Sequence, residues 1–393
     1  MDIPAFTIAR LPKIIFGSGA INQLPEQIAQ YGKRVLLVTG ARSFRITSHW
    51  PVLLDDLRHR GALVEMLSIS GEPSPQDVDE AVQNYRPLNI EVVVAVGGGS
   101  VLDAAKAIAG LLPHGNSVMD HLEGVGRGLA YRGPSVPFIA VPTTAGTGSE
   151  ATKNAVLSVQ GAEGFKKSFR HDDLIARVAI VDPDLLKSCP PELIAANGMD
   201  AFTQLLESYV SSRANPFTDA LAWSGMRAVR DGLFAAWEGG NGAEADRARA
   251  CMAYGSLLSG ITLAQVGLGS VHGLASPLGA YFPIAHGVVC GTLVAAATQV
   301  NIRALTERAD RSPALDKYAQ VAALLSKETT PSQPLWEILQ GWTDRLGMAR
   351  LGAYGVCESD IGKIVANARG GSMQTNPIVL TDEEIAVIVR TRL

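Results

Sequence analysis

Cysteine is scarce in this chain, with four among 393 residues, and no two of them stand at a C-x-x-C spacing. The wide spread of Cys189, Cys251, Cys290 and Cys357 argues against a disulfide framework and against a zinc knuckle. We therefore expect each cysteine to be either a small buried hydrophobe or an ordinary surface thiol.

Long apolar runs and an excess of positive charge are also missing. Nowhere do about 18 uncharged apolar residues run together, and the N-terminus lacks the pattern of a signal peptide. The 34 Lys and Arg residues against 38 Asp and Glu residues give a formal net charge of -4. This balance offers no support for a nucleic-acid or anionic-membrane partner. We expect a cytoplasmic protein with neither kind of partner.

The length and the pattern of apolar residues predict two domains. A chain of 393 residues exceeds what one hydrophobic core usually serves. Continuous apolar runs in the first half are typical of parallel strands buried on both faces, and helical patterns at 48–61 and 74–87 separate the first three of them. The predicted strands are 34–39, 63–69, 91–96, 137–141 and 178–181.

The character of the chain changes after Pro190, where helical periodicity replaces strand-like runs. We predict an α/β domain with a parallel sheet over residues 1–185. An all-α domain then follows over residues 186–393. The proline-containing stretch 181–193 marks the boundary.

Two loops of the first domain suggest a nucleotide site. The strand-like run 91–96 leads through Gly97, Gly98, Gly99 and Ser100 into a helix, whose N-terminal amides and dipole favour a pyrophosphate. Ser100 is expected either to cap this helix or to donate to phosphate. Asp103 has two readings, a first-turn acid that stabilises the helix dipole or a polar contact near a nicotinamide.

The second loop, PTTAGTGSEAT (142–152), follows the strand-like run 137–141. Ligands of open α/β sheets bind outside the carboxyl ends of strands, where hydroxyls and exposed amides suit phosphate and ribose. The loop's candidate contacts are Thr143, Thr144, Thr147 and Ser149.

The second domain holds a possible metal site. Asp200 and Gln204 stand four residues apart on one helix face, so a carboxylate and an amide oxygen can converge. His272 and His286 would add two imidazole nitrogens, a donor set that suits Fe(II) or Zn(II). The alternative is that the histidines are buried hydrogen-bonding groups and that Asp200 is a helix cap.

Several motifs in order resemble the iron-dependent, group III alcohol dehydrogenases, which include lactaldehyde and 1,3-propanediol reductases and the related maleylacetate reductases. The matching segments cover nearly the whole chain; they are IIFGSGAINQLP, GGGSVLDAAKA, PTTAGTGSEATKNAV, VAIVDPDL, NGMDAFTQLLESY, HGLASPLGAYFPIAHGVVCGTLV and SMQTNPIVLTDEEI. The resemblance implies a dinucleotide-binding domain, a helical domain, and cofactor and metal between them.

The resemblance also assigns residues. It implies that the cofactor contacts Lys166 or its neighbour Lys167, and that Asp200, the Gln204 position, His272 and His286 hold the metal. The full cofactor-binding set is Gly40, Gly71, Gly97, Gly98, Gly99, Ser100, Asp103, Thr143, Thr144, Thr147, Ser149, Lys166 and Lys167; the catalytic set is Ser276, His272 and His286.

Three positions depart from the family's pattern. Gln204 stands where a histidine ligand is usual, and an amide oxygen is a weaker ligand for these metals. Ser276 replaces a common histidine near the nicotinamide, and a hydroxyl can relay a proton but cannot hold one near neutral pH. Gly40 stands where NAD-preferring members tend to have an acid, so Arg42 and Ser43 are free to bind a 2′-phosphate and either NAD or NADP is possible.

The expected function is the interconversion of a small alcohol and an aldehyde or ketone by hydride transfer with NAD(P), with iron or zinc polarising the substrate oxygen. One alternative is a metal-independent reductase of an acidic carbonyl substrate, similar to maleylacetate reductases or acting on a phosphonate aldehyde. Another is a non-catalytic nucleotide-binding protein. The resemblance further implies a homodimer, with residues 6–17 as a candidate for pairing across the interface.

Overall fold

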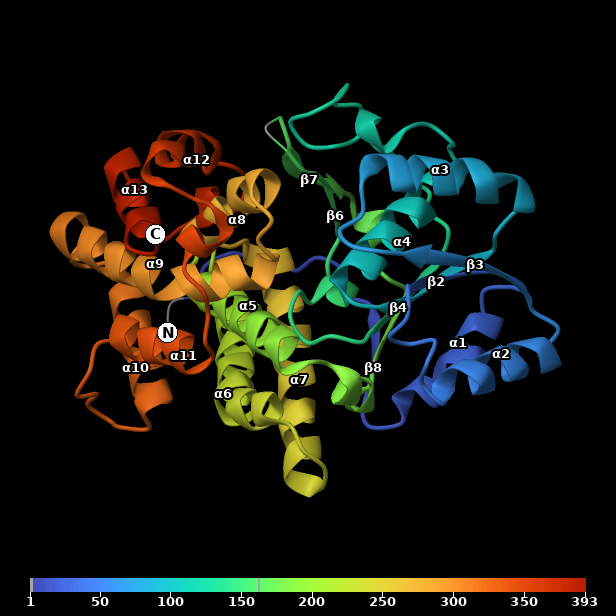
Figure 1. Ribbon diagram of the computed structural model, residues 1–393, viewed down its shortest axis with the longest axis horizontal. Coiled ribbons are helices and arrows are strands. Elements are labelled where there is room, and N and C mark those ends of the chain that lie inside the picture. Colours follow the sequence, from blue (N-terminus) through green and yellow to red (C-terminus); the bar gives the residue numbers. More distant parts are fainter. Residues whose placement is uncertain (1–2, 162) are drawn as a thin grey trace.

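The computed structural model describes residues 3–161 and 163–393, which form an α/β part and a helical part lying side by side (Figure 1). A parallel sheet flanked by helices comes first in the sequence, and a group of helices follows. The predicted fold class is confirmed.

Among the described residues, six strands form the parallel sheet in the order β1-β8-β5-β4-β2-β3. They are β1 (Lys13–Phe16), β2 (Arg34–Gly40), β3 (Leu63–Ile69), β4 (Val92–Gly97), β5 (Phe138–Pro142) and β8 (Val178–Val181). The chain winds from β2 outward to β3 and then returns to β4 on the other side of β2. Ligands bind at such a reversal, outside the carboxyl ends of the two strands. Thr39 pairs with Val96, so Gly40 and Gly97 end their strands side by side.

Helices cover both faces of the sheet (Figure 1). On one face α1 (Leu24–Ala29) and α2 (His49–His59) bury Leu24 and Leu53 against the strands. On the other, α3 (Pro75–Tyr85) and α4 (Gly99–Leu111) do the same. Burial on both faces explains why the inner strands are continuous apolar runs.

One predicted strand is less buried than expected. β3 occupies 63–69 as predicted, but most of its residues are exposed or half-buried, and Leu63 keeps 67% of its surface exposed. The prediction of burial on both faces is wrong here because β3 is the last strand of the sheet, with a partner on one side only.

An antiparallel hairpin of β6 (Asn154–Val159) and β7 (Phe165–Arg170) was not predicted. Its second strand, FKKSFR, has neither a continuous apolar run nor a clean alternation. The hairpin packs against α4 and α8 (Ser270–Tyr281), so it lies beside both parts of the protein.

The helical part begins with α5 (Pro191–Val210), whose second half is almost entirely buried. Local signals start the next helix: the Asn215 side chain accepts from the amides of Phe217 and Thr218, and Pro216 fits the first turn. The other helices are α6 (Pro216–Glu238), α7 (Ala243–Val266), α9 (His286–Arg308), α10 (Pro313–Ser326), α11 (Leu335–Arg345), α12 (Ile361–Asn367) and α13 (Asp382–Arg390).

Two glycines bring the α/β part against the helical part. A Cβ at Gly148 would lie 2.4 Å from the backbone of Gly260 in α7, and Gly148 has a φ of +60°. A Cβ at Gly146 would lie 2.7 Å from Asn197 in α5. The threonine-rich loop therefore sits directly on α7 and on α5, the helix that carries Asp200 and Gln204.

Helix α9 is long and apolar enough by composition to cross a membrane, as α7 and α8 would be together if they were not bent by 101°. In the protein, 72% of the apolar window of α9 is buried against other elements. A central core helix has the same length and composition, so this is weak evidence for a span.

Candidate active site

The glycine loop and the threonine-rich loop touch each other at the carboxyl edge of the sheet. A Cβ at Gly98 would lie 3.3 Å from the Thr144 hydroxyl, and one at Gly99 only 2.8 Å from the Thr147 side chain. The N-cap of α4 is Gly98, so the capping role suggested for Ser100 is wrong; Ser100 lies in the first turn. The amides of Val101 and Leu102 donate to the Gly98 carbonyl, which leaves the amides of Gly99 and Ser100 at the start of the turn for a phosphate.

Asp103 joins these two loops. Its carboxylate accepts from the Ser149 hydroxyl at 2.5 Å and from the amide of Val156 in β6 at 3.2 Å. Both hydrogen bonds come from protein groups that hold the second loop in place, which is neither of the two roles considered for Asp103. We infer that Asp103 fixes the shape of the cofactor loops.

The fully buried Lys106, one turn further along α4, completes this link. Its Nζ donates to the carbonyls of Ser149 and Asn154 at 2.9 and 2.6 Å and to two hydroxyls, and lies 3.5 Å from Asp103 Oδ1. Burial lowers the pKa of Lys106, while the Asp103 charge opposes this shift. Sequence reasoning missed Lys106, although its position three residues after Asp103 places both on one helix face.

Lys166 and Lys167 are the two candidate lysines for cofactor contact, and Lys166 is the one that faces the helical part of the protein. Lys166 Nζ pairs with Glu72 Oε1 at 2.5 Å, and its backbone carbonyl accepts from the Ser276 hydroxyl at 3.1 Å. Lys167, next along β7, points to the opposite side, where its Nζ would lie 3.8 Å from a Cβ at Gly124. Ser276 thus ties α8 to β7.

The two remaining cofactor candidates also lie at strand ends. Gly40 closes β2, and a Cβ there would meet Ser43 Oγ at 3.7 Å without a clash. Gly71 follows β3 with a φ of +76°, directly before Glu72. Arg42 is exposed just beyond Gly40.

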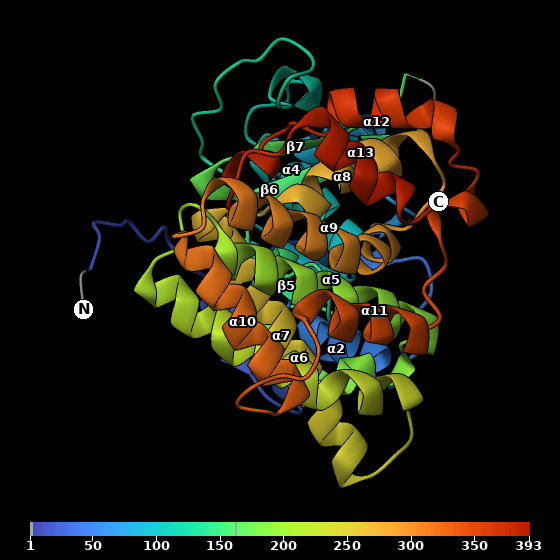
Figure 2. The same cartoon turned by 90° about the vertical axis from the view of Figure 1, so that its left-hand side faces the viewer.

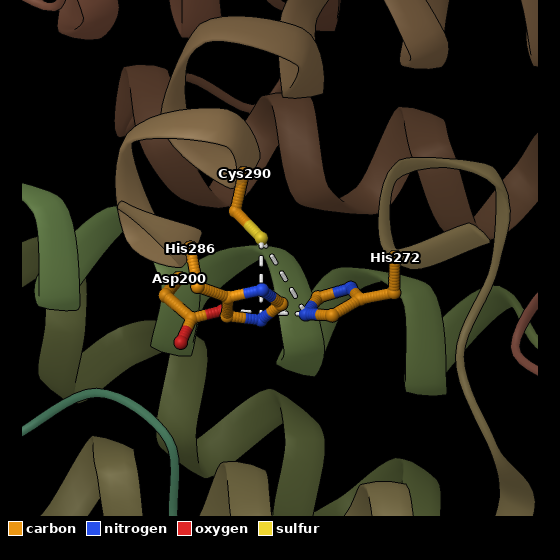
Figure 3. Close-up of side chains that lie close together, drawn as sticks. All are labelled: Asp200, His272, His286 and Cys290. Atoms are coloured by element: carbon orange, nitrogen blue, oxygen red, sulfur yellow. Dashed lines mark hydrogen bonds and ion pairs between the residues drawn. The ribbon is translucent and has the colours of Figure 1, made fainter. Parts of the chain in front are cut away.

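The two histidines and Asp200 converge, as Figure 3 shows. His272 Nε2 lies 3.2 Å from Asp200 Oδ1, and His286 Nε2 lies 3.6 Å from the same oxygen. His272 comes from α8, His286 from α9 and Asp200 from α5. Asp200 and His286 are 86 residues apart in the sequence. Asp200 is 1% exposed, whereas the His286 side chain keeps 27% of its surface exposed.

Gln204 is next to this group but turns its amide oxygen away from it. Its Oε1 accepts from the Ser259 hydroxyl at 2.7 Å, and its Nε2 donates to Asp200 Oδ1 at 3.3 Å. In this arrangement Gln204 orients the aspartate rather than acting as the fourth ligand we expected. Ser259 also lies 3.5 Å from the carbonyl of Gly146, so the two predicted sites are connected through Gln204 and Ser259.

Glu207, which sequence reasoning missed, orients His272. Its carboxylate accepts from His272 Nδ1 at 2.6 Å and from the amides of Gly269 and Val271 at 2.9 and 2.7 Å. With Nδ1 donating to a carboxylate, Nε2 carries the lone pair that a metal needs. Glu207 stands seven residues after Asp200, which puts it on the same face of α5.

The electrostatics of the group suit a cation. Burial works against ionisation of Asp200, but its interactions with His286 and His272, including the hydrogen bond from His272, hold its pKa below the ordinary value. Burial, with the charges of Lys166 and His272, lowers the pKa of His286 to about 4, which keeps that imidazole neutral. Burial also disfavours a charged His272, but Cys290, Glu207 and Asp200 raise its pKa well above the ordinary value. A metal at Nε2 would take the place of that proton.

Cys290 completes the cluster. Asp200, His272, His286 and Cys290 each offer one ligand atom, and these atoms lie within 4.8 Å of one another. Carboxylate, imidazole and thiol are the donors of transition-metal sites, and a carboxylate orients the other nitrogen of His272, so the residues fit such an ion. Sequence reasoning treated Cys290 as inert, although it stands four residues after His286 on α9.

A dinucleotide-type sheet whose phosphate loops abut a buried Asp-His-His group defines a nicotinamide-dependent oxidoreductase with a metal site. Residues 12–183 match the family described as iron-containing alcohol dehydrogenase, and residues 194–393 match the C-terminal part of the Fe-containing alcohol dehydrogenase family.

Individual relatives agree with these matches. Long-chain-alcohol dehydrogenase 1 of Geobacillus thermodenitrificans is 35% identical over 95% of this chain and 93% of its own length. The NAD-dependent methanol dehydrogenase of Bacillus methanolicus is 31% identical over 97% and 98%. A crystal structure of 1,3-propanediol oxidoreductase superposes with a TM-score of 0.86 at 30% identity, covering 99% of this chain and 100% of that one.

The chain belongs to the iron-containing alcohol dehydrogenases. It is an enzyme that interconverts alcohols and carbonyl compounds with a nicotinamide cofactor.

Proposed function

We propose that this enzyme reduces a small aldehyde to its alcohol with NADPH, and catalyses the reverse reaction, at a divalent iron or zinc ion held by Asp200, His272 and His286. The observation that carries the proposal is the meeting of these three side chains beside the cofactor loops. When bound, the metal supplies a Lewis acid that polarises the substrate oxygen and stabilises developing alkoxide charge.

The protein groups bind and orient the reactants. The amides at the start of α4 and the hydroxyls of Thr144 and Thr147 bind the pyrophosphate and its neighbouring sugar. Gln204 and Glu207 hold Asp200 and His272 in ligand geometry. Ser276 donates to the Lys166 carbonyl in this structure, so a role in proton relay requires it to exchange that bond for one to substrate or water.

The preference for NADPH is argued from the end of β2. Gly40 offers no carboxylate to accept from the ribose hydroxyls or to repel a phosphate, and Arg42 follows two residues later. A steady-state screen over aldehydes, including an acidic one, with NADH and NADPH at defined iron and zinc tests the proposal. The Gly40→Asp variant should raise the KM for NADPH and leave that for NADH equal or lower. Equal rates with and without metal, or no turnover with any aldehyde, would contradict the proposal.

We also propose a cytoplasmic homodimer. β1 is an edge strand of the sheet with Ile14 and Phe16 exposed, and the segment before it projects from the body of the molecule (Figure 2). An unpaired, apolar edge favours pairing with another chain. Light scattering coupled to gel filtration should give twice the chain mass, and a variant lacking residues 1–9 should shift toward monomer. Cell fractionation tests the location.

A further inference from the structure

Cys290 places a thiol against the predicted metal ligands. It lies one helical turn after His286 on α9 and is fully buried. Its Sγ lies 3.6 Å from His272 Nε2 and 3.8 Å from His286 Nε2, so it faces the ligand nitrogens of both histidines (Figure 3).

Four of the six separations among the ligand atoms agree with one four-coordinate ion. Zinc bonds of about 2.0 Å to nitrogen and oxygen and about 2.3 Å to sulfur place nitrogen and sulfur about 3.5 Å apart in a tetrahedron, and nitrogen and oxygen about 3.3 Å apart. The nitrogen-to-sulfur distances here are 3.6 and 3.8 Å, and the nitrogen-to-oxygen distances are 3.2 and 3.6 Å.

The position at which the family pattern has its remaining metal ligand is Gln204, and this side chain already makes other hydrogen bonds. Gln204 accepts from Ser259 and donates to Asp200, so both ends of its amide are used. To ligate through oxygen it would have to give up the 2.7 Å bond from Ser259, whereas Cys290 already points its sulfur at the group.

We propose that Cys290 is the fourth ligand, which makes this an Asp-His-His-Cys site in which Gln204 only orients the aspartate. On coordination the thiol loses its proton to solvent and the sulfur donates an electron pair to the ion. Two anionic ligands then balance a divalent charge, and the soft sulfur favours Zn(II) and Co(II) over Fe(II). The inference rests on the proposed function in requiring that the cluster holds a metal, which would become five-coordinate when it polarises the substrate oxygen.

The direct test is X-ray absorption spectroscopy of the wild-type enzyme loaded with one equivalent of zinc. We expect one sulfur scatterer at about 2.3 Å among nitrogen and oxygen scatterers. A bound zinc ion with only nitrogen and oxygen neighbours would overturn the inference and leave the alcohol dehydrogenase proposal standing. Failure to bind zinc, iron or any other divalent metal would overturn both the inference and the proposed metal-dependent function.

Cobalt substitution identifies which cysteine is responsible. The wild-type cobalt enzyme should show a thiolate-to-cobalt charge-transfer band in the near ultraviolet. Cys290→Ser should lose the band and bind zinc about tenfold or more weakly, while the matched control Cys251→Ser, on α7, should keep both properties. A band that persists in folded Cys290→Ser protein would refute the assignment.

Discussion

At the scale of single residues, the site depends on groups that hold the ligands. Glu207 is buried, accepts from His272 Nδ1 and also binds two amides at the start of α8. One side chain therefore sets both the tautomer of a ligand and the position of the helix that carries it. Mutation of partners of this kind typically lowers metal affinity about 10- to 100-fold.

The Glu207→Gln variant should bind metal about 10- to 100-fold more weakly, because the neutral amide no longer enforces the Nε2 lone pair of His272. Competition with a chromophoric chelator measures this change. NADPH affinity, measured by fluorescence titration, should stay the same. Glu192→Gln, which changes an exposed acid in the first turn of the same helix, should alter neither property. Unchanged metal affinity in Glu207→Gln would show that the contact does not orient the ligand.

A second buried acid, Glu150, should make the free energy of unfolding depend on pH. Glu150 lies in the threonine-rich loop with 2% of its surface exposed, and burial raises its pKa to about 7, against the pull of Lys106. Since the unfolded chain releases this proton near the ordinary pKa of 4.5, the folded state holds one proton more between about pH 5 and 7. Stability is therefore fully present below about pH 4.5 and declines as the pH rises through 7.

The Glu150→Gln variant removes this decline. Relative to wild type, its free energy of unfolding should be equal near pH 4 and greater by roughly 3 kcal/mol at pH 8. Urea unfolding at the two pH values measures the difference. Glu244→Gln, an exposed acid at the start of α7, should follow wild type at both. A constant offset between Glu150→Gln and wild type would mean that Glu150 is ionised in the folded enzyme across this range.

At the scale of elements, the two cofactor loops can approach each other closely because the glycines at their contact carry no side chain. A Cβ at Gly99 would lie 2.8 Å from Thr147, closer than real Cβ atoms approach, so a larger residue must push the loops apart. By contrast, a Cβ added at Gly341 in α11 would meet no atom within 4 Å.

Gly99→Ala should therefore weaken NADPH binding by about tenfold or more, because the amides at the start of α4 shift relative to the threonine hydroxyls. Isothermal titration calorimetry measures the affinity. Gly341→Ala should leave it unchanged and raise the free energy of unfolding by about 0.5–1 kcal/mol, as expected for alanine in a helix. Equal affinity in Gly99→Ala and wild type would place the pyrophosphate elsewhere.

The sequence was a good guide to elements whose environment is uniform. The runs at 34–39 and 178–181 are buried on both faces and were predicted within a residue. β3 has the same apolar composition but stands at an edge, and edge position depends on strand order rather than on the run itself. The β6–β7 hairpin was missed because FKKSFR owes its strand to cross-strand pairing and to packing on α8.

At the scale of the whole molecule, the site could be predicted only in part. The spacing of Asp200 and Gln204 and the resemblance led to Asp200, His272 and His286, which the structure brings together, and the glycines led to two loops that touch each other. Lys106, Glu207 and Cys290 lie three, seven and four residues from predicted site residues on the same helices, so helical periodicity could place them on the correct faces. Their partners come from other segments, and no local pattern shows which segments the fold brings together.

The central claim is that the metal held by Asp200, His272 and His286 carries the activity. The most direct measurement is to strip the purified enzyme with a chelator, restore the metal in steps, and follow NADPH-dependent aldehyde reduction alongside the metal content. Our account predicts negligible activity in the stripped enzyme and recovery that saturates at one ion per chain. Full activity in metal-free enzyme, with folding and NADPH binding intact, would contradict it.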